Sequence, residues 1–241
     1  MTTKDDEQQA PLSWPPLQPL VPAADLTFTT LLPDQVLIVS RLWTATLSKT
    51  YVSFLATLPL VTTPGKPKKG NAVRVNDRYQ IDDPDFAEKL WSDTALKQLV
   101  EHPTIDDIEL NTAEREHLWG GEVLGLNSNI RIYRYSAGQF FDRHFDESNN
   151  VSFPSSTAGL NTPAKTTWTL LLYLTSCKGG ETVFYPEPAS KREPTPTPIV
   201  AELEVGMALL HRHGKDCLLH EGREVLEGEK WVIRSDLCVR R

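Results

Sequence analysis

Hydrophobic and polar residues follow two different periodicities along this chain of 241 residues. In the first half, apolar residues recur every three or four positions, which is the spacing of an amphipathic helix. This spacing predicts one helix within 40–58 and a second within 83–102, where Asp83 can cap the N-terminus and Pro84 suits the first turn. Before them, the β-branched and apolar run 26–43 favours a strand.

From about residue 121 onward the pattern changes to short apolar runs separated by Gly, Pro, Ser and Asn clusters, which is typical of strands. The predicted strands lie within 127–139, 166–176, 179–186, 200–214, 217–225 and 229–239. Successive short strands without helices between them favour an antiparallel sandwich or barrel. We therefore predict an α+β fold, in which N-terminal helices buttress a jelly-roll core, that is, a double-stranded β-helix.

The prediction for domain organisation is a single domain over 23–241. Its helical support covers about 23–118 and its jelly-roll core about 119–241. Residues 1–22 are rich in proline and polar groups and show no periodicity, so we expect a flexible tail.

Composition excludes several classes of protein. The net charge of -7 opposes broad nucleic-acid affinity, and we expect no nucleic-acid partner. No apolar run approaches the roughly 20 residues of a membrane span, and the first residues lack the order of a secretion signal, so we expect a cytoplasmic or nuclear protein without a membrane partner. The three cysteines form no CxxC pair, which argues against a disulfide framework and a structural zinc site.

A histidine and a carboxylate two residues apart, His144 and Asp146, mark the first candidate site. At the end of a strand, side chains at i and i+2 point to the same face, so both could reach one metal ion. Two histidines and one carboxylate form the facial triad of non-haem iron(II) oxygenases, which leaves open coordination positions. An HxD sequence also arises in solvated turns, so a second histidine from a neighbouring strand is required.

Among the other histidines, His220 is the best candidate because it closes the apolar run "CLLH". His211 and His213 lead into a Gly-Lys-Asp turn, and we expect them at a loop edge. His102 and His117 lie in or near the helical half, where we expect surface positions.

An oxygenase of this type that uses 2-oxoglutarate also needs a buried cation for the distal carboxylate of that co-substrate. Lys230 lies ten residues after His220, at the start of the next predicted strand, and is the preferred anchor. Arg234 points to the same strand face and competes for the role.

Three blocks of sequence together resemble the catalytic domain of the prolyl 4-hydroxylase branch of 2-oxoglutarate/iron(II) oxygenases. They are "YRYSAGQFFDRHFD", "LLLYLTSCKGGETVFYP" and "GMALLHRHGKDCLLHEGREVLEGEKWVIRSDL", and the resemblance covers roughly residues 121–241. It implies that His144, Asp146 and His220 bind Fe(II), and that Lys230 pairs with 2-oxoglutarate. It further implies that Tyr135 reaches the co-substrate and that Thr169 lines the same pocket, although either could be an ordinary strand residue.

The activity implied by this resemblance is hydroxylation of an unactivated C–H bond, coupled to decarboxylation of 2-oxoglutarate to succinate. Its cofactors are Fe(II), 2-oxoglutarate as co-substrate and O2, with ascorbate as the reductant. The favoured substrate is a prolyl residue in a peptide or protein. The alternatives are a free amino acid or another small metabolite, a non-catalytic jelly-roll binding protein, and, remotely, a nucleic-acid demethylase.

Two long irregular segments, 61–82 and 147–166, are candidate lids over the site. In the first of them, Arg74, Asn76 and Arg78 are candidate contacts to a peptide backbone or to an acidic group of the substrate. A plain solvated loop explains these residues equally well.

Overall fold

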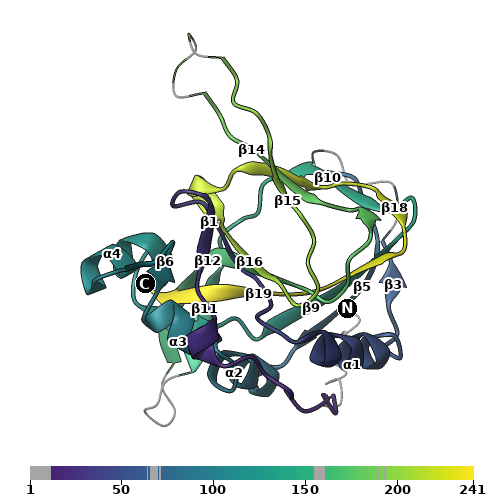
Figure 1. Ribbon diagram of the computed structural model, residues 1–241, viewed down its shortest axis with the longest axis horizontal. Helices are drawn as coiled ribbons and strands as arrows, with labels where there is room; N and C mark the ends of the chain where they lie inside the picture. The colour runs from purple at the N-terminus through teal and green to yellow at the C-terminus, as the bar shows by residue number, and fades with distance from the viewer. Residues whose placement is uncertain are drawn as a thin grey trace, which may run out of the picture.

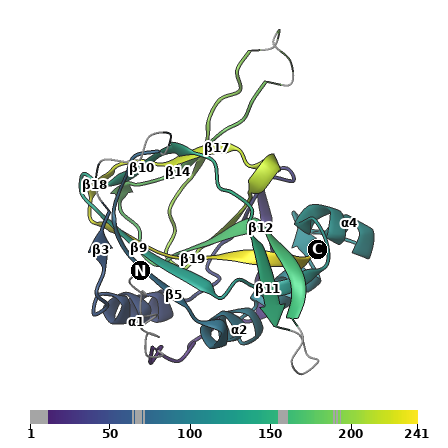
Figure 2. The ribbon, with the colours of Figure 1, turned by 180° about the vertical axis from the view of Figure 1, so that it is seen from behind.

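The computed structural model describes residues 12–63, 65, 70, 72–154, 161–188, 190, 192 and 194–241. Two antiparallel sheets face each other, and helices cover the outer face of the larger one (Figures 1 and 2). The helices are α1 (Ala45–Leu55), α2 (Pro84–Ser92), α3 (Leu96–Glu101) and α4 (Thr112–Trp119), with short 3-10 turns at Ala23–Asp25 and Gly214–Asp216.

The main path of the larger sheet runs β1 (Thr29–Leu32), β2 (Val36–Val39), β16 (Ala208–Arg212), β12 (Asn161–Tyr173), β19 (Glu229–Arg240), β9 (Asn129–Ser136), β5 (Asp77–Asp82) and β3 (Val61–Thr62). Off this path, β11 (Asn150–Pro154) pairs with β12, and β8 (Val123–Leu126) pairs with β19. The smaller sheet runs β15 (Ile199–Ala201), β14 (Thr182–Tyr185), β17 (Leu219–Gly222), β10 (Phe140–His144) and β4 (Arg74–Val75). Two short ribbons pair β13 (Lys178–Gly179) with β18 (Val225–Glu227) and β6 (Thr104–Ile105) with β7 (Ile108–Glu109). This arrangement confirms the predicted α+β jelly-roll class.

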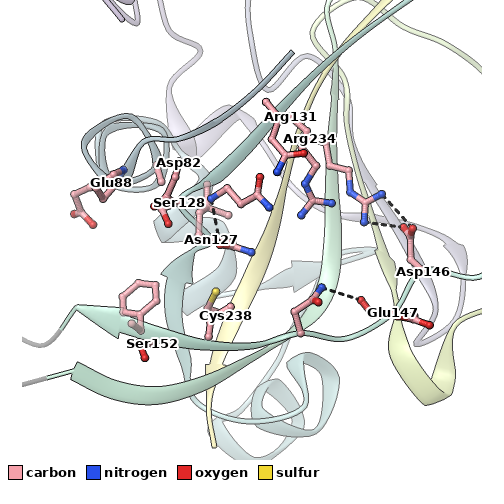
Figure 3. Close-up of a pocket in the computed structure, with 18 of the residues that line it drawn as sticks. Asp82, Glu88, Asn127, Ser128, Arg131, Asp146, Glu147, Ser152, Arg234 and Cys238 are labelled. Atoms are coloured by element: carbon pink, nitrogen blue, oxygen red, sulfur yellow. Dashed lines mark hydrogen bonds and ion pairs between the residues drawn. The ribbon is translucent and has the colours of Figure 1, made fainter. Parts of the chain in front are cut away.

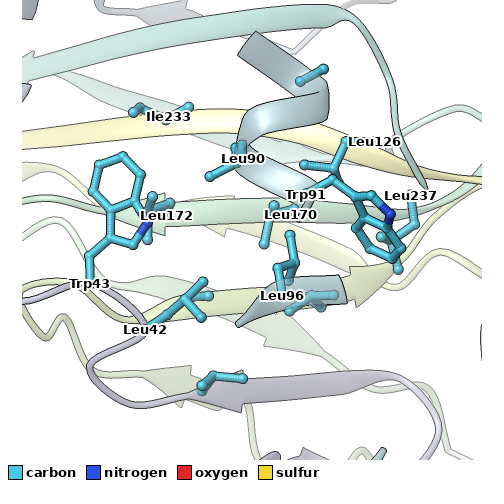
Figure 4. Close-up of a cluster of buried hydrophobic side chains, with 14 of the residues drawn as sticks. Leu42, Trp43, Leu90, Trp91, Leu96, Leu126, Leu170, Leu172, Ile233 and Leu237 are labelled. Atoms are coloured by element: carbon cyan, nitrogen blue, oxygen red, sulfur yellow. The ribbon is translucent and has the colours of Figure 1, made fainter. Parts of the chain in front are cut away.

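Side chains of the central strands alternate between the helix layer and the space between the sheets. On β12, Leu170 and Leu172 pack in the core beneath the helices, whereas Thr169, next to Leu170, faces the space between the sheets. On β19, Ile233 joins the same core (Figure 4). Arg234 on the same strand faces inward, where it bonds to Asp146. Because side chains alternate with a period of two, a fixed register turns the apolar residues of these strands toward the helices. It turns the polar residues toward the space between the sheets.

The second predicted helix is divided into α2 and α3 by a polar interruption. The predicted cap is confirmed, because the carboxylate of Asp83 accepts a hydrogen bond from Phe86 N at 2.9 Å. After α2, the hydroxyl of Thr94 donates to Leu90 O at 2.7 Å and accepts from Leu96 N at 3.2 Å. Short polar side chains compete in this way for backbone groups and end helices.

The segment predicted as helical support also contributes strands. The predicted run 26–43 forms a hairpin of β1 and β2 rather than one strand. Helix α4 lies where no helix was expected. The candidate lid 61–82 is partly regular, since it contains β3, β4 and β5, while residues 64, 66–69 and 71 lie outside the described residues. In the other lid, β11 and β12 pair, and residues 155–160 lie outside the described residues.

Residues 12–22, expected to belong to a flexible tail, pack against the helices. The ring of Trp14 stacks on Phe86 with centroids 3.7 Å apart, and its indole N–H donates to Asp83 at 2.8 Å. The phenol of Tyr51 donates to Pro15 O at 2.8 Å. The expectation of a tail is therefore wrong for this part, while residues 1–11 lie outside the described residues. No helix within the described ranges is long and apolar enough to cross a membrane.

Candidate active site

His144, Asp146 and His220 meet at the inner face of the smaller sheet. His144 ends β10, His220 lies on β17, and the two residues are register partners across the strands. The Nε2 atoms of His144 and His220 each lie 3.8 Å from a carboxylate oxygen of Asp146. These three side chains form a group whose ligand atoms all lie within 4.8 Å of one another.

Both histidines are oriented and protonated as metal ligands require. His144 Nδ1 lies 2.7 Å from Asp142 O, and His220 Nδ1 lies 2.9 Å from Leu218 O. Each Nδ1–H therefore donates to a carbonyl, which leaves the Nε2 lone pair free toward Asp146. Burial lowers the pKa of His144 to about 3 and also lowers that of His220, so both rings are neutral. The residues present thus fit a divalent metal ion that accepts nitrogen and oxygen ligands.

Arg234 neutralises the carboxylate of this group. Its guanidinium donates to the two oxygens of Asp146 at 3.1 and 3.0 Å, as the dashed lines in Figure 3 show. It also lies 3.4 Å from Asp236. Burial alone would raise the pKa of Asp146, but Arg234 and the adjacent histidines lower it well below its usual range. Arg234 is thus paired with two carboxylates of the protein itself.

Thr169 contacts the carboxylate rather than the cavity beside Lys230. Its hydroxyl lies 3.1 Å from Asp146 Oδ2 and 3.3 Å from Arg234. The side chain is fully buried. Thr169 therefore orients Asp146, and it does not line the cavity beside Lys230.

Lys230 lies in an adjoining small cavity of about 50 Å³, which His144, Asp146 and His220 also line. Its ammonium donates to Gly180 O at 2.6 Å and lies over the rings of Tyr135 and Tyr173 at 5.6 and 5.2 Å. No carboxylate of the described residues lies within ion-pair distance of it. Burial lowers the pKa of Lys230 to about 8. A buried ammonium without an acidic partner can receive an anionic group of a ligand.

A groove of about 990 Å³ reaches Asp146 from outside (Figure 3). Arg74 and Arg78 line it together with Phe141. Neither arginine forms an ion pair with a residue that the structure describes, and Arg74 lies over the Phe141 ring at 4.9 Å. Asn76, in contrast, is fully buried and bonds to Thr63, so it does not line the groove. Asn76, unlike the other two substrate candidates, therefore has a structural role.

Two other histidines differ from expectation. His211 lies on β16 and is only 2% exposed, with Nε2 3.7 Å from Asp146 Oδ2. His213 is also buried, and its two ring nitrogens lie 2.9 Å from the hydroxyls of Thr169 and Thr166. The expected loop-edge position is wrong for His211, because β16 and its pairing with β12 extend through that residue. His213 follows β16 at the start of the 3-10 turn, as expected, although its side chain is buried. His102 and His117 are exposed, as expected.

The fold and the geometry of the site define a jelly roll with a candidate metal centre between its sheets. Residues 130–235 match the family model described as the 2OG-Fe(II) oxygenase superfamily. This segment holds all three proposed metal ligands and Lys230. Residues 130–235 are thus the part of the chain that is similar to this superfamily, and they lie within the segment that carries the sequence resemblance. No curated protein sequence matches the chain.

Solved structures with the same fold include several oxygenases. A prolyl hydroxylase from Trichoplax adhaerens, in complex with a hypoxia inducible factor peptide fragment, is 14% identical with a TM-score of 0.55, over 85% of this chain and 84% of that one. A prolyl-4-hydroxylase from Pseudomonas putida is 13% identical with a TM-score of 0.52, over 86% and 94%. HygX from Streptomyces hygroscopicus, with nickel and 2-oxoglutarate bound, is 14% identical with a TM-score of 0.50, over 85% and 83%. At these identities the likeness shows the shared fold.

Proposed function

We propose that this protein is a 2-oxoglutarate- and Fe(II)-dependent dioxygenase that hydroxylates an unactivated C–H bond. One observation carries the proposal: two neutral histidines and one carboxylate converge beside a cavity whose cation has no acidic partner among the described residues. A structural ion-pair network would not need that cation, whereas a dicarboxylate co-substrate does.

The residues divide the work as follows. His144, Asp146 and His220 hold Fe(II), while Arg234 and Thr169 hold the carboxylate of Asp146 in place. When bound, the metal supplies the activation of O2 that couples decarboxylation of 2-oxoglutarate to succinate with hydroxylation of the substrate. Ascorbate would serve as a reductant that keeps the metal in the ferrous state.

Lys230 and Tyr135 bind the distal carboxylate of 2-oxoglutarate. Lys230 offers a charge-assisted hydrogen bond. Burial raises the pKa of the Tyr135 phenol far above neutrality, so the hydroxyl stays protonated and can donate to the same carboxylate. Both side chains are buried, and the low effective dielectric constant of a buried site strengthens both interactions.

The favoured substrate is a prolyl residue in a peptide or protein. The size and open outline of the groove beside Asp146 support an extended chain as substrate. In the similar Trichoplax adhaerens structure, a prolyl hydroxylase is in complex with a peptide fragment.

A second candidate substrate is a free amino acid or another small metabolite with an acidic group. Arg74 and Arg78 favour it, because both line the groove without an ion pair to a described residue. A carboxylate on the substrate would be their natural partner.

The experiment is incubation of the protein with Fe(II), ascorbate, 2-oxoglutarate and either proline-containing peptides or free amino acids, with product masses measured. We expect one compound class to gain one oxygen atom. His144→Ala, Asp146→Ala and His220→Ala should each abolish this gain while the circular dichroism spectrum stays unchanged. Wild-type product formation in any of the three variants would remove that residue from the metal site.

A further inference from the structure

The groove beside Asp146 carries carboxylates at the end that the proposed function does not use. Asp82 ends β5, and Asp85 and Glu88 follow on α2, three residues apart and thus on one face of the helix. Figure 3 shows Asp82 and Glu88 on the opposite side of the groove from Asp146. All three carboxylates are exposed, and none forms an ion pair with a residue that the structure describes. This end of the groove therefore presents negative charge to a bound ligand.

The end of the groove near the proposed metal ligands carries the opposite charge. Arg74 lies on β4 and Arg78 on β5, and both line the groove. Burial lowers the pKa of Arg78, and the nearby guanidiniums of Arg74 and Arg131 lower it further, so like charges gather here. A guanidinium stays charged at neutral pH in spite of such a shift. Arg131 is already paired with Asp236, whereas Arg74 and Arg78 remain available for an anionic group of a ligand.

Strand β5 fixes the spacing of the two charged ends. Arg78, Gln80 and Asp82 occupy alternate positions on it, so their side chains point to one face, and all three line the groove. Gln80, between the two charges, is neutral and accepts a hydrogen bond from Arg78. A strand rises by about 3.3 Å per residue, so the backbone positions of Arg78 and Asp82 lie about 13 Å apart. The charge of the groove therefore changes sign over the length of about four extended residues.

We propose that the groove binds an extended peptide that carries an acidic residue and, about four residues away, a basic residue. The acidic side chain binds beside Arg74 and Arg78, near the proposed metal ligands. The basic side chain binds beside the carboxylates of Asp82, Asp85 and Glu88. The inference rests on the proposed function, since it names the class of substrate for that same site.

The two charged ends separate the candidate substrates. The ammonium and the carboxylate of a free amino acid are attached to one carbon atom and cannot reach both ends of the groove. A peptide of one charge only would place like charges together, either at Arg74 and Arg78 or at the acidic end, and such contacts cost affinity. The groove thus selects both the sign of the charges and their separation along the chain.

The test measures binding of short synthetic peptides to the full-length protein by fluorescence anisotropy, with Fe(II) and 2-oxoglutarate present and O2 excluded. Each peptide contains one proline between two charged positions that lie about four residues apart. These positions carry Glu and Lys, Lys and Glu, Glu and Glu, or Lys and Lys, so the two mixed peptides cover both chain directions. The better mixed peptide should bind at least about tenfold more tightly than either like-charged peptide. This difference should shrink as the salt concentration rises.

Charge reversal in the protein assigns the two ends of the groove. Glu88→Lys should bind the Glu/Glu peptide at least about threefold more tightly than the wild-type protein does, and Arg78→Glu should do the same for the Lys/Lys peptide. A variant that fails to fold cannot gain affinity in this way. Glu116→Lys is the matched control, because it changes the net charge equally at an exposed position of α4 outside the groove. It should keep the wild-type affinity for every peptide.

Equal binding of mixed and like-charged peptides would overturn the inference, and so would a gain in Glu116→Lys as large as that in Glu88→Lys. Oxygen incorporation separates this failure from failure of the proposed function. Hydroxylation of peptides or free amino acids without any preference for charge would overturn only the inference. Binding of a mixed peptide together with Fe(II) and 2-oxoglutarate, but without succinate once O2 is admitted, would contradict the proposed function while the binding preference stands.

Discussion

Lys230 and Arg234 lie four residues apart on β19 and differ in what they contact. Arg234 is paired with Asp146 and Asp236, whereas the ammonium of Lys230 bonds only to a backbone carbonyl and a hydroxyl among the described residues. A cation that already neutralises two protein carboxylates is poorly suited to bind a third, from a ligand. The sequence left both residues open as anchors, and their contacts favour Lys230.

Lys230→Met is predicted to raise the KM for 2-oxoglutarate strongly. Removing one partner of a buried charge pair costs about 2–5 kcal/mol, and kcat with saturating co-substrate should fall much less. Steady-state kinetics with varied 2-oxoglutarate checks this. The matched control is Lys178→Met, an exposed lysine two residues from Gly180, which should keep the wild-type KM. An unchanged KM in Lys230→Met would place the anchor elsewhere.

The pH dependence of kcat/KM for 2-oxoglutarate should follow from the charge of Lys230. Burial lowers the pKa of Lys230 to about 8, and the amine binds a carboxylate only in its charged form, below that pKa. The value of kcat/KM for 2-oxoglutarate should therefore be constant below pH 8 and fall about tenfold per pH unit above it. In Lys230→Arg this fall should vanish, because a guanidinium stays charged. The same fall in Lys230→Arg would assign the titration to another group.

His211 shows why part of the site escaped sequence reasoning. The run "MALLH" is apolar at successive positions, so alternation could not reveal which face His211 shares. Its position follows only from strand pairing, since His211 is the register partner of Thr169. The grouping of His144, Asp146 and His220 was accessible from the sequence, because the HxD spacing and the place of His220 at the end of the apolar run "CLLH" are local features. The choice between Lys230 and Arg234 required contacts between distant residues.

At the scale of elements, every strand segment predicted in the second half contains a strand, because turn residues mark its ends. However, β10 and β11 lie outside the predicted segments, and the segment 200–214 reaches into both β15 and β16. Helix α4 was missed although it carries a sequence signal. Asn111 caps Ala113 and Glu114, and the Glu114 carboxylate accepts from Asn111 N, which makes a capping box. Its apolar face is small, with only Leu118 and Trp119 buried, so periodicity did not reveal it.

The turn before β14 depends on glycine at position 179. Gly179 has a φ of +73°, and a Cβ there would lie 2.4 Å from Glu224 O. Gly179→Ala should therefore reduce the free energy of unfolding by about 3 kcal/mol, as measured by urea denaturation. Gly138 is the matched control, since it also has a positive φ, +84°, but open space around its Cβ. Gly138→Ala should cost about 1 kcal/mol, and equal losses would contradict the close approach.

At the scale of the whole molecule, the segment 12–22 links the start of the described chain to the helix layer. The many proline and polar residues of this segment did not predict that it packs against the helices. The packing depends on single large side chains rather than on a periodic pattern. Trp14 contacts both Phe86 and the capping residue Asp83 of α2. The segment thus stabilises the helices that cover the larger sheet.

Trp14→Ala is predicted to lower the free energy of unfolding by about 2 kcal/mol, because stacking and a hydrogen bond are lost together. Thermal and urea unfolding would measure this. Trp14→Phe keeps an aromatic ring and should lose only about 1 kcal/mol. If Trp14→Ala unfolds like the wild-type protein, the segment does not contribute to stability.

The most direct test of the whole account is succinate formation from 2-oxoglutarate by the purified, Fe(II)-loaded protein. Succinate formation should depend on Fe(II), be stimulated by the true substrate, and be absent after chelation of the metal and in Asp146→Ala. Protein that binds Fe(II) and 2-oxoglutarate but forms no succinate with any peptide or amino acid would contradict it. A non-catalytic jelly roll that retains the site would then be the better description.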